Sequence, residues 1–82
     1  MSGALRTSLA TFVRAELARG QPELDVEKDS LVDSGVIDSV GIMKLVSFIE
    51  KELHVKIGDE DLLPENFETL SDIVKLVESK RA

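Results

Sequence analysis

Ser39 is the residue of this chain whose position best suits it for chemistry. It lies where an acidic stretch meets a segment whose apolar residues recur with helical spacing, at Ile42, Leu45, Val46, Ile49 and Leu53. Asp38 and Ser39 therefore fall where helix N-caps are expected. A hydroxyl there lies beside free backbone N–H groups and the positive end of the helix dipole, which stabilise an attached anion. Ser39 is thus a candidate attachment point for a phosphate ester, although a serine before a helix is more often only a cap.

The same serine does not fit a hydrolase. The one histidine, His54, follows fifteen residues later on the same expected helix, roughly 22 Å away at about 1.5 Å per residue. A nucleophile and its base must lie within hydrogen-bond reach, and the G-x-S-x-G elbow is absent. Any activation of Ser39 must come from another protein, so we expect no enzyme activity, and His54 is expected at the surface near a helix end.

The acidic loops raise calcium as an alternative. Asp25, Glu27 and Asp29 alternate as in an EF-hand loop. Ser30, however, occupies the position of the turn glycine, and Val36 that of the bidentate glutamate. The chain has no cysteine, which excludes disulfides and thiolate metal sites. We expect no metal site.

Size and charge limit the function further. The 82 residues, with 43% hydrophobic composition, predict one globular domain spanning residues 1–82. A net charge of −6 argues against nucleic acid as a partner. Neither a signal segment nor an apolar run long enough to span a bilayer is visible, so a cytoplasmic monomer without membrane contact is expected. The acidic residues gather in the connections at 20–38 and 58–69, either as solvated loops or to steer the chain toward basic enzyme surfaces.

The expected elements are all helical, and the fold class is all-α. Helices are predicted over residues 4–19, over 39–53 and from Thr69 onward, where Thr69 and Asp72 resemble a capping box. A single helical turn after Gly58 would have Asp59 as its cap and end at Pro64. The first and last helices have apolar faces that we expect to be buried, made by Leu5, Leu9, Phe12, Val13 and Leu17 and by Leu70, Ile73, Val74 and Val77.

The connection at residues 20–38 is far longer than the ~2–8 residues usual in helical bundles. Gly35 gives it a permissive backbone just before Ser39. Its apolar residues are expected to hold it across the bundle: Leu24, Val26, Leu31, Val32, Val36 and Ile37.

The stretch GVIDSVGIMKLVSFIEKELHVKI followed by GDEDLLPENFETLSDIVKLV resembles the acyl and peptidyl carrier protein family. In that family an Asp-Ser-(Leu/Met/Val) motif opens the second helix, and Asp38, Ser39 and Val40 match it in order. The resemblance implies an acyl-carrier-like four-helix bundle with three main helices and one short one. It further implies that Ser39 carries 4′-phosphopantetheine, supported by Asp38.

The resemblance also implies partners. A phosphopantetheinyl transferase would move the arm from coenzyme A to Ser39 with magnesium. An acyl- or aminoacyl-activating ligase would load the thiol as a thioester, and downstream condensing or transfer enzymes would use it. The competing interpretation is a helical adaptor that binds its partners noncovalently, with Ser39 only a helix cap.

Two features near Ser39 bear on the choice of partner. Val40 and Met43 share a helical face outside the expected buried stripe. They form either an apolar docking patch or packing for the long loop, and the two roles are compatible. Gly41 and Lys44 occupy positions where fatty-acid-synthesis carriers commonly have acids. We therefore expect Lys44 to help select partners, and the chain to serve a specialised polyketide, peptide or aminoacyl pathway.

Overall fold

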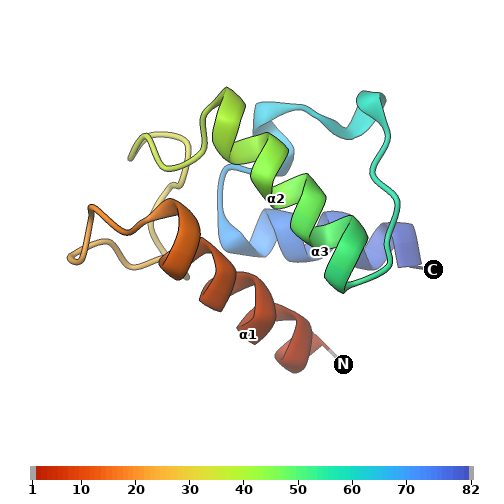
Figure 1. Cartoon of the computed structure of the whole chain (residues 1–82), viewed down its shortest axis with the longest axis horizontal. Coiled ribbons are helices and arrows are strands. Elements are labelled where there is room, and N and C mark those ends of the chain that lie inside the picture. The colour runs from red at the N-terminus through yellow and green to blue at the C-terminus, as the bar shows by residue number, and fades with distance from the viewer. Residues whose placement is uncertain (1, 82) are drawn as a thin grey trace.

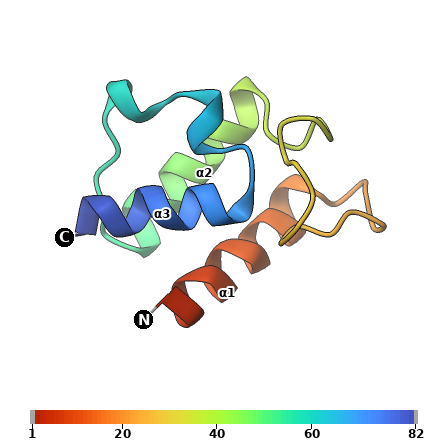
Figure 2. The ribbon, with the colours of Figure 1, turned by 180° about the vertical axis from the view of Figure 1, so that it is seen from behind.

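The computed structural model describes residues 2–81, and their fold is all-helical, as predicted (Figure 1). The α-helices are α1 (Ser2–Phe12), α2 (Ser39–Glu52) and α3 (Leu70–Arg81). Two short 3-10 turns, Asp59–Asp61 and Pro64–Asn66, lie between α2 and α3. Residues 2–81 contain no strand. Figures 1 and 2 show α1 and α2 running in opposite directions, and α2 crosses α3 in both views. No described helix is long and apolar enough to cross a bilayer.

The first helix does not keep one geometry to its end. After Phe12 the chain continues as a π-helical turn, Val13–Leu17, which closes where the Ala18 N–H donates to the Val13 carbonyl at 2.8 Å. The helical region thus ends two residues before the predicted limit at Arg19. A π turn holds one more residue per hydrogen-bonded ring than an α turn, and such turns are frequent at functional sites.

The core lies between the three helices and confirms the expected buried faces. The fully or nearly fully buried helical residues are Leu5, Leu9, Val13, Leu45, Ile49, Leu70, Ile73, Val74, Leu76 and Val77. Phe12, Leu17, Ile42, Val46 and Leu53 from the same faces are only partly buried. Phe67, from the segment before α3, is 0% exposed and is the largest of the fully buried side chains.

The connection between α1 and α2 is held to the bundle, as expected. Val26, Leu31, Val36 and Ile37 are buried in the core, and Leu24 and Val32 are partly buried against it. Its backbone is also fastened, because the Leu31 N–H donates to the Glu68 carbonyl at 2.6 Å and the Ile37 N–H donates to the Leu31 carbonyl at 2.9 Å. Gly35 has a φ of +83°, a value that side chains disfavour.

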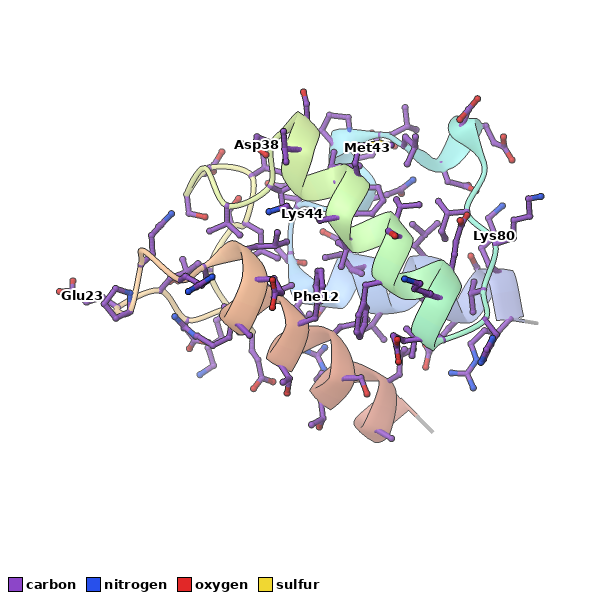
Figure 3. All side chains as sticks on the ribbon, in the orientation of Figure 1. Phe12, Glu23, Asp38, Met43, Lys44 and Lys80 are labelled. Atoms are coloured by element: carbon purple, nitrogen blue, oxygen red, sulfur yellow. The ribbon has the colours of Figure 1, made fainter. Side chains whose placement is uncertain are left out.

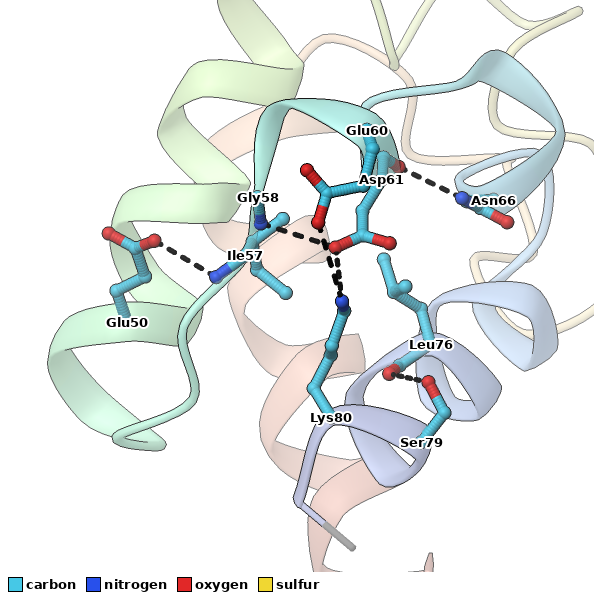
Figure 4. Close-up of polar contacts among 9 residues, drawn as sticks. All are labelled: Glu50, Ile57, Gly58, Glu60, Asp61, Asn66, Leu76, Ser79 and Lys80. Carbon is cyan, nitrogen blue, oxygen red and sulfur yellow. Dashed lines mark hydrogen bonds and ion pairs between the residues drawn. The ribbon is translucent and has the colours of Figure 1, made fainter.

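The connection between α2 and α3 differs from the prediction at both ends of its expected helical turn. Gly58, rather than Asp59, is the N-cap residue, and its N–H donates to the Asp61 carboxylate at 3.2 Å (Figure 4). Pro64 opens a second turn instead of ending the first. Proline suits that position, because it has a fixed φ and the first N–H of a helix needs no partner. The one short helix that we expected is therefore two 3-10 turns.

This segment is fixed to α3 at its middle and at its C-terminal end. The Lys80 Nζ lies 2.7 Å from Asp61 Oδ2 and 3.9 Å from Glu60 Oε2. At the start of α3, the Asp72 N–H donates to Thr69 Oγ1 at 3.2 Å, and the Thr69 hydroxyl donates to the Asp72 carboxylate at 3.0 Å. The expected Thr69–Asp72 cap is thus present.

Candidate functional site

Asp38 caps the N-terminus of α2. It has an extended backbone, with φ −124° and ψ −169°, and its Oδ1 accepts a hydrogen bond from the Gly41 N–H at 2.7 Å. Its carbonyl accepts the first helical hydrogen bond, from the Ile42 N–H at 2.8 Å. Ser39 is the first residue of the helix, so the alternative in which Ser39 serves as the cap is wrong. The Asp38 carboxylate already accepts a hydrogen bond from the Gly41 N–H, the group that a capping side chain would bind.

The Ser39 side chain is exposed, and no residue in the described part of the chain forms a hydrogen bond with its hydroxyl. The first N–H groups of α2 point out of the same end of the helix, where the dipole is positive. A phosphate ester on this oxygen would therefore gain favourable electrostatics without displacing any existing contact. The residues present fit such a group.

Other catalytic groups are not gathered here. His54 is exposed just beyond the opposite end of α2, where it takes a left-handed φ of 56°. Within residues 2–81, no group of three or more histidine, cysteine, aspartate or glutamate side chains could hold a metal ion. No histidine lies beside Ser39, and the carboxylate of the preceding Asp38 is engaged by the Gly41 N–H.

Gly41 is glycine for a steric reason. A Cβ at this position would lie 2.8 Å from the Val36 carbonyl oxygen and 3.2 Å from Asp38 Oδ1. Both distances are shorter than ordinary carbon–oxygen contact, so the loop before Ser39 can reach the first turn of α2 only over a glycine. Loop packing therefore explains why residue 41 is not acidic. The absence of an acidic residue here is weaker evidence about the choice of partner enzymes than the sequence suggested.

The remaining predicted site residues lie on two sides of α2. Val40 and Met43 are 61% and 63% exposed, as expected for residues outside the buried stripe. Lys44 instead extends on the side of α2 that faces α1, where it lines a groove with Phe12 and Glu16 (Figure 3). The structure thus leaves Val40 and Met43 exposed close to Ser39 and separates Met43 from Lys44, whereas Val40 also lines a small hollow together with Lys44.

An exposed serine on the first turn of a helix, with the cap supplied by its neighbour, defines a class of site suited to covalent modification. The family model described as "Phosphopantetheine attachment site" matches residues 7–77. The chain belongs to this family of carrier proteins, and 4′-phosphopantetheine is its covalently attached group. The group supplies a flexible arm that ends in a thiol.

Relatives agree with this assignment. The "Probable acyl carrier protein PigG" of Serratia sp. (strain ATCC 39006) is 37% identical over 65 residues, which cover 72% of this chain and 75% of that protein. An acyl carrier protein of Clostridium perfringens (strain SM101 / Type A) is 32% identical over 69 residues, covering 84% and 87%.

Solved structures give the same fold. A chain in the crystal structure of an FAD-dependent dehydrogenase is 27% identical with a TM-score of 0.72, over 84% of this chain and 97% of that one. A chain in the structure of Bradyrhizobium japonicum glycine:[carrier protein] ligase, complexed with its cognate carrier protein and an analogue of glycyl adenylate, is 25% identical. Its TM-score is 0.69, over 92% of this chain and 97% of that chain.

Proposed function

We propose that Ser39 is the residue that carries 4′-phosphopantetheine, and that the chain acts as one carrier domain without catalytic activity of its own. The observation that carries this proposal is that two neighbouring residues have different roles at the start of α2. Asp38 supplies the cap, while the Ser39 hydroxyl is exposed and has no other role in the described structure. The loaded thiol would hold an acyl or aminoacyl group as a thioester and present it to one enzyme after another.

The partners follow from this role. A phosphopantetheinyl transferase installs the arm, an acyl- or aminoacyl-activating ligase loads it, and condensing or transfer enzymes consume the product. Val40 and Met43 form the apolar contact next to Ser39, because both are well exposed and lie within one turn of it. Lys44 adds a charge that distinguishes among partner surfaces.

Within this role we propose a specialised pathway, of polyketide, peptide or aminoacyl type. Lys44 supports it, because a positive charge on α2, the helix that begins at Ser39, disfavours docking to a strongly basic surface. The similarity to a chain solved with a glycine:[carrier protein] ligase supports the aminoacyl type in particular. Gly41 no longer adds support, since its identity is explained by the contact with Val36.

The test is the intact mass of the purified protein after incubation with coenzyme A, magnesium and a broad-specificity transferase. The unmodified chain should gain the mass of one phosphopantetheine, and Ser39→Ala should gain none. Ser47→Ala is the matched control, because Ser47 is another exposed serine on α2, and it should be modified normally. Modification of Ser39→Ala would overturn the assignment of the residue. A complete lack of modification in all three proteins would instead favour the noncovalent adaptor.

A further inference from the structure

The groove between α1 and α2 is a feature of the surface that the carrier role leaves unexplained. Phe12 of α1 and Phe48 of α2 stack across it, with ring centroids 4.4 Å apart and an interplanar angle of 25°. Both rings are only partly buried. They line two adjoining hollows, of about 380 and 460 Å³, together with Glu16 and Glu52. We call these four residues and the two hollows the α1–α2 groove.

The composition of the hollow without basic residues matches a small cation with an apolar part. Glu16 and Glu52 line both hollows, whereas Lys44 and Lys51 line only one of them. The other hollow adds the hydroxyl-bearing residues Thr7, Ser8 and Thr11 and has no basic residue. Carboxylates, hydroxyl groups and aromatic faces are the groups that bind an ammonium ion, and ring surfaces also accept an aliphatic side chain.

A smaller hollow lies between the groove and the start of α2, next to the proposed attachment residue. This third hollow, of about 180 Å³, is lined by Asp38, Val40 and Gly41 at the start of α2, and it shares Glu16 and Lys44 with the groove. Glu16 belongs to the π-helical turn at Val13–Leu17. From Ser39 to Phe48 is nine residues along α2, roughly 13 Å at about 1.5 Å per residue. An extended phosphopantetheine arm covers that distance.

We propose that the α1–α2 groove binds the aminoacyl end of the loaded arm. Glu16 and Glu52 interact with its free ammonium group, and the Phe12–Phe48 pair contacts its side chain. Lys44 lies between the groove and the helix start, where its positive charge faces the phosphate of the arm. This inference rests on the proposed attachment at Ser39, and it predicts that the chain distinguishes an aminoacyl group from an acyl group of the same shape.

The test compares two stable loaded forms that differ by one amino group. A transferase attaches the arms of two coenzyme A analogues, which end in a valyl amide or in a 3-methylbutanoyl amide, to Ser39 with release of adenosine 3′,5′-bisphosphate. Intact mass establishes attachment first. NMR then records the ring and backbone resonances of each form. We expect the valyl form to shift the resonances of Phe12, Glu16, Phe48 and Glu52, and the 3-methylbutanoyl form to shift them less.

Charge-neutral variants make the comparison specific. In the double variant E16Q/E52Q the two loaded forms should give nearly the same spectrum. The control E23Q/E78Q removes the same charge from exposed positions outside the groove, and it should preserve the difference. If loading is complete but the shifted resonances are confined to the first turn of α2 and are equal for both forms, the groove does not bind the aminoacyl end, although attachment at Ser39 stands. If no mass is gained, both proposals fail.

Discussion

The Asp38 carboxylate accepts the Gly41 N–H at 2.7 Å, and this contact spans the residue that would carry the arm. This hydrogen bond fixes the first turn of α2 from the position before Ser39, so the turn does not need the serine hydroxyl as a hydrogen-bond partner. The loop reaches the helix at the same point, because Gly41 leaves space for the Val36 carbonyl. The helix cap and the proposed modification thus fall on neighbouring residues, and mutation can separate their effects.

Asp38→Ala should destabilise the fold more than Ser39→Ala does. Loss of an N-cap typically costs about 0.5–2 kcal/mol, whereas an exposed side chain without partners usually changes stability by less than about 0.5 kcal/mol. Urea denaturation of both variants measures the difference. The opposite order would show that the serine hydroxyl, and not the carboxylate, caps α2 in solution.

Gly41→Ala should be destabilising by about 1–3 kcal/mol, the usual cost of forcing a methyl group into a filled space. The new Cβ would meet the backbone oxygen of Val36 at 2.8 Å, and backbone cannot turn away as a long side chain can. Gly3→Ala in α1 is the control, since a Cβ there meets nothing within 4 Å. That control should be neutral or stabilising by up to about 1 kcal/mol. Equal stability of the two variants would contradict the close approach of the loop.

Leu45→Ala and Ile49→Ala should each lower the free energy of unfolding by about 2–5 kcal/mol, because both side chains are fully buried. Met43→Ala on the same helix removes a side chain that is 63% exposed, and it should cost less than about 0.5 kcal/mol. Thermal melting followed by circular dichroism compares the three. A Met43 variant as damaged as the other two would mean that this face of α2 is covered.

Met43→Asp should weaken loading or transfer by the cognate enzymes while the bundle still folds, because it puts a charge into the proposed apolar contact. Lys44→Glu should improve use of the chain by fatty-acid-synthesis enzymes, since a repulsive charge becomes an attractive one. Transfer rates at low and physiological salt provide the measurement, because exposed charges are screened over about 8–10 Å. If Lys44→Glu leaves the transfer rates of both the cognate and the fatty-acid-synthesis enzymes unchanged at low salt, Lys44 has no role in partner selection.

Lys80→Met should make the free energy of unfolding less dependent on pH in the acidic range. The hydrogen bond from Lys80 holds the pKa of Asp61 below its ordinary value, with a further contribution from the Gly58 N–H. A lowered carboxyl pKa in the folded state contributes stability above the unfolded value of about 4, and this contribution disappears as the pH falls through the folded value.

The pH dependence is measured by urea midpoints between pH 7 and pH 2.5, with Lys75→Met, an exposed lysine of α3, as the control. The unmodified chain and the control should lose stability more steeply below pH 4 than Lys80→Met does. The same hydrogen bond raises the pKa of Lys80. Deprotonation of Lys80 therefore removes the stabilisation by this pair only at strongly alkaline pH, outside the range of the experiment. Identical acid curves for all three proteins would show that the pair does not form in solution.

Helical periodicity was enough to predict the three helices and their buried faces, because the spacing of Leu45 and Ile49 permits only one inward side of α2. The site was predictable in part, since an acidic residue and a serine before such a segment mark a helix start. Which of the two caps the helix depends on loop geometry that spacing alone does not contain. The same holds for Gly41, whose neighbour Val36 is brought to it by the turn at Gly35.

Other features depend on contacts between distant parts of the chain. The stack of Phe12 on Phe48 joins two helices, and no periodicity within either helix reveals it. His54 takes a left-handed backbone where glycine or asparagine would be expected, so the sequence contains no signal for that turn. The start of the second 3-10 turn at Pro64 was wrongly predicted as an end, because proline is compatible with both positions.

The hydrogen bond from Leu31 to Glu68 has a consequence for the timing of biosynthesis. The loop that leads to Ser39 is anchored by Glu68, which the ribosome adds after Ser39, and its apolar side chains need the core that α3 completes. A nascent chain that ends before α3 therefore exposes the serine without a formed helix start. If Ser39 carries the arm as proposed, we expect a transferase to modify chains that already include α3 and to pass over shorter ones, so that the arm is added only after this domain has folded.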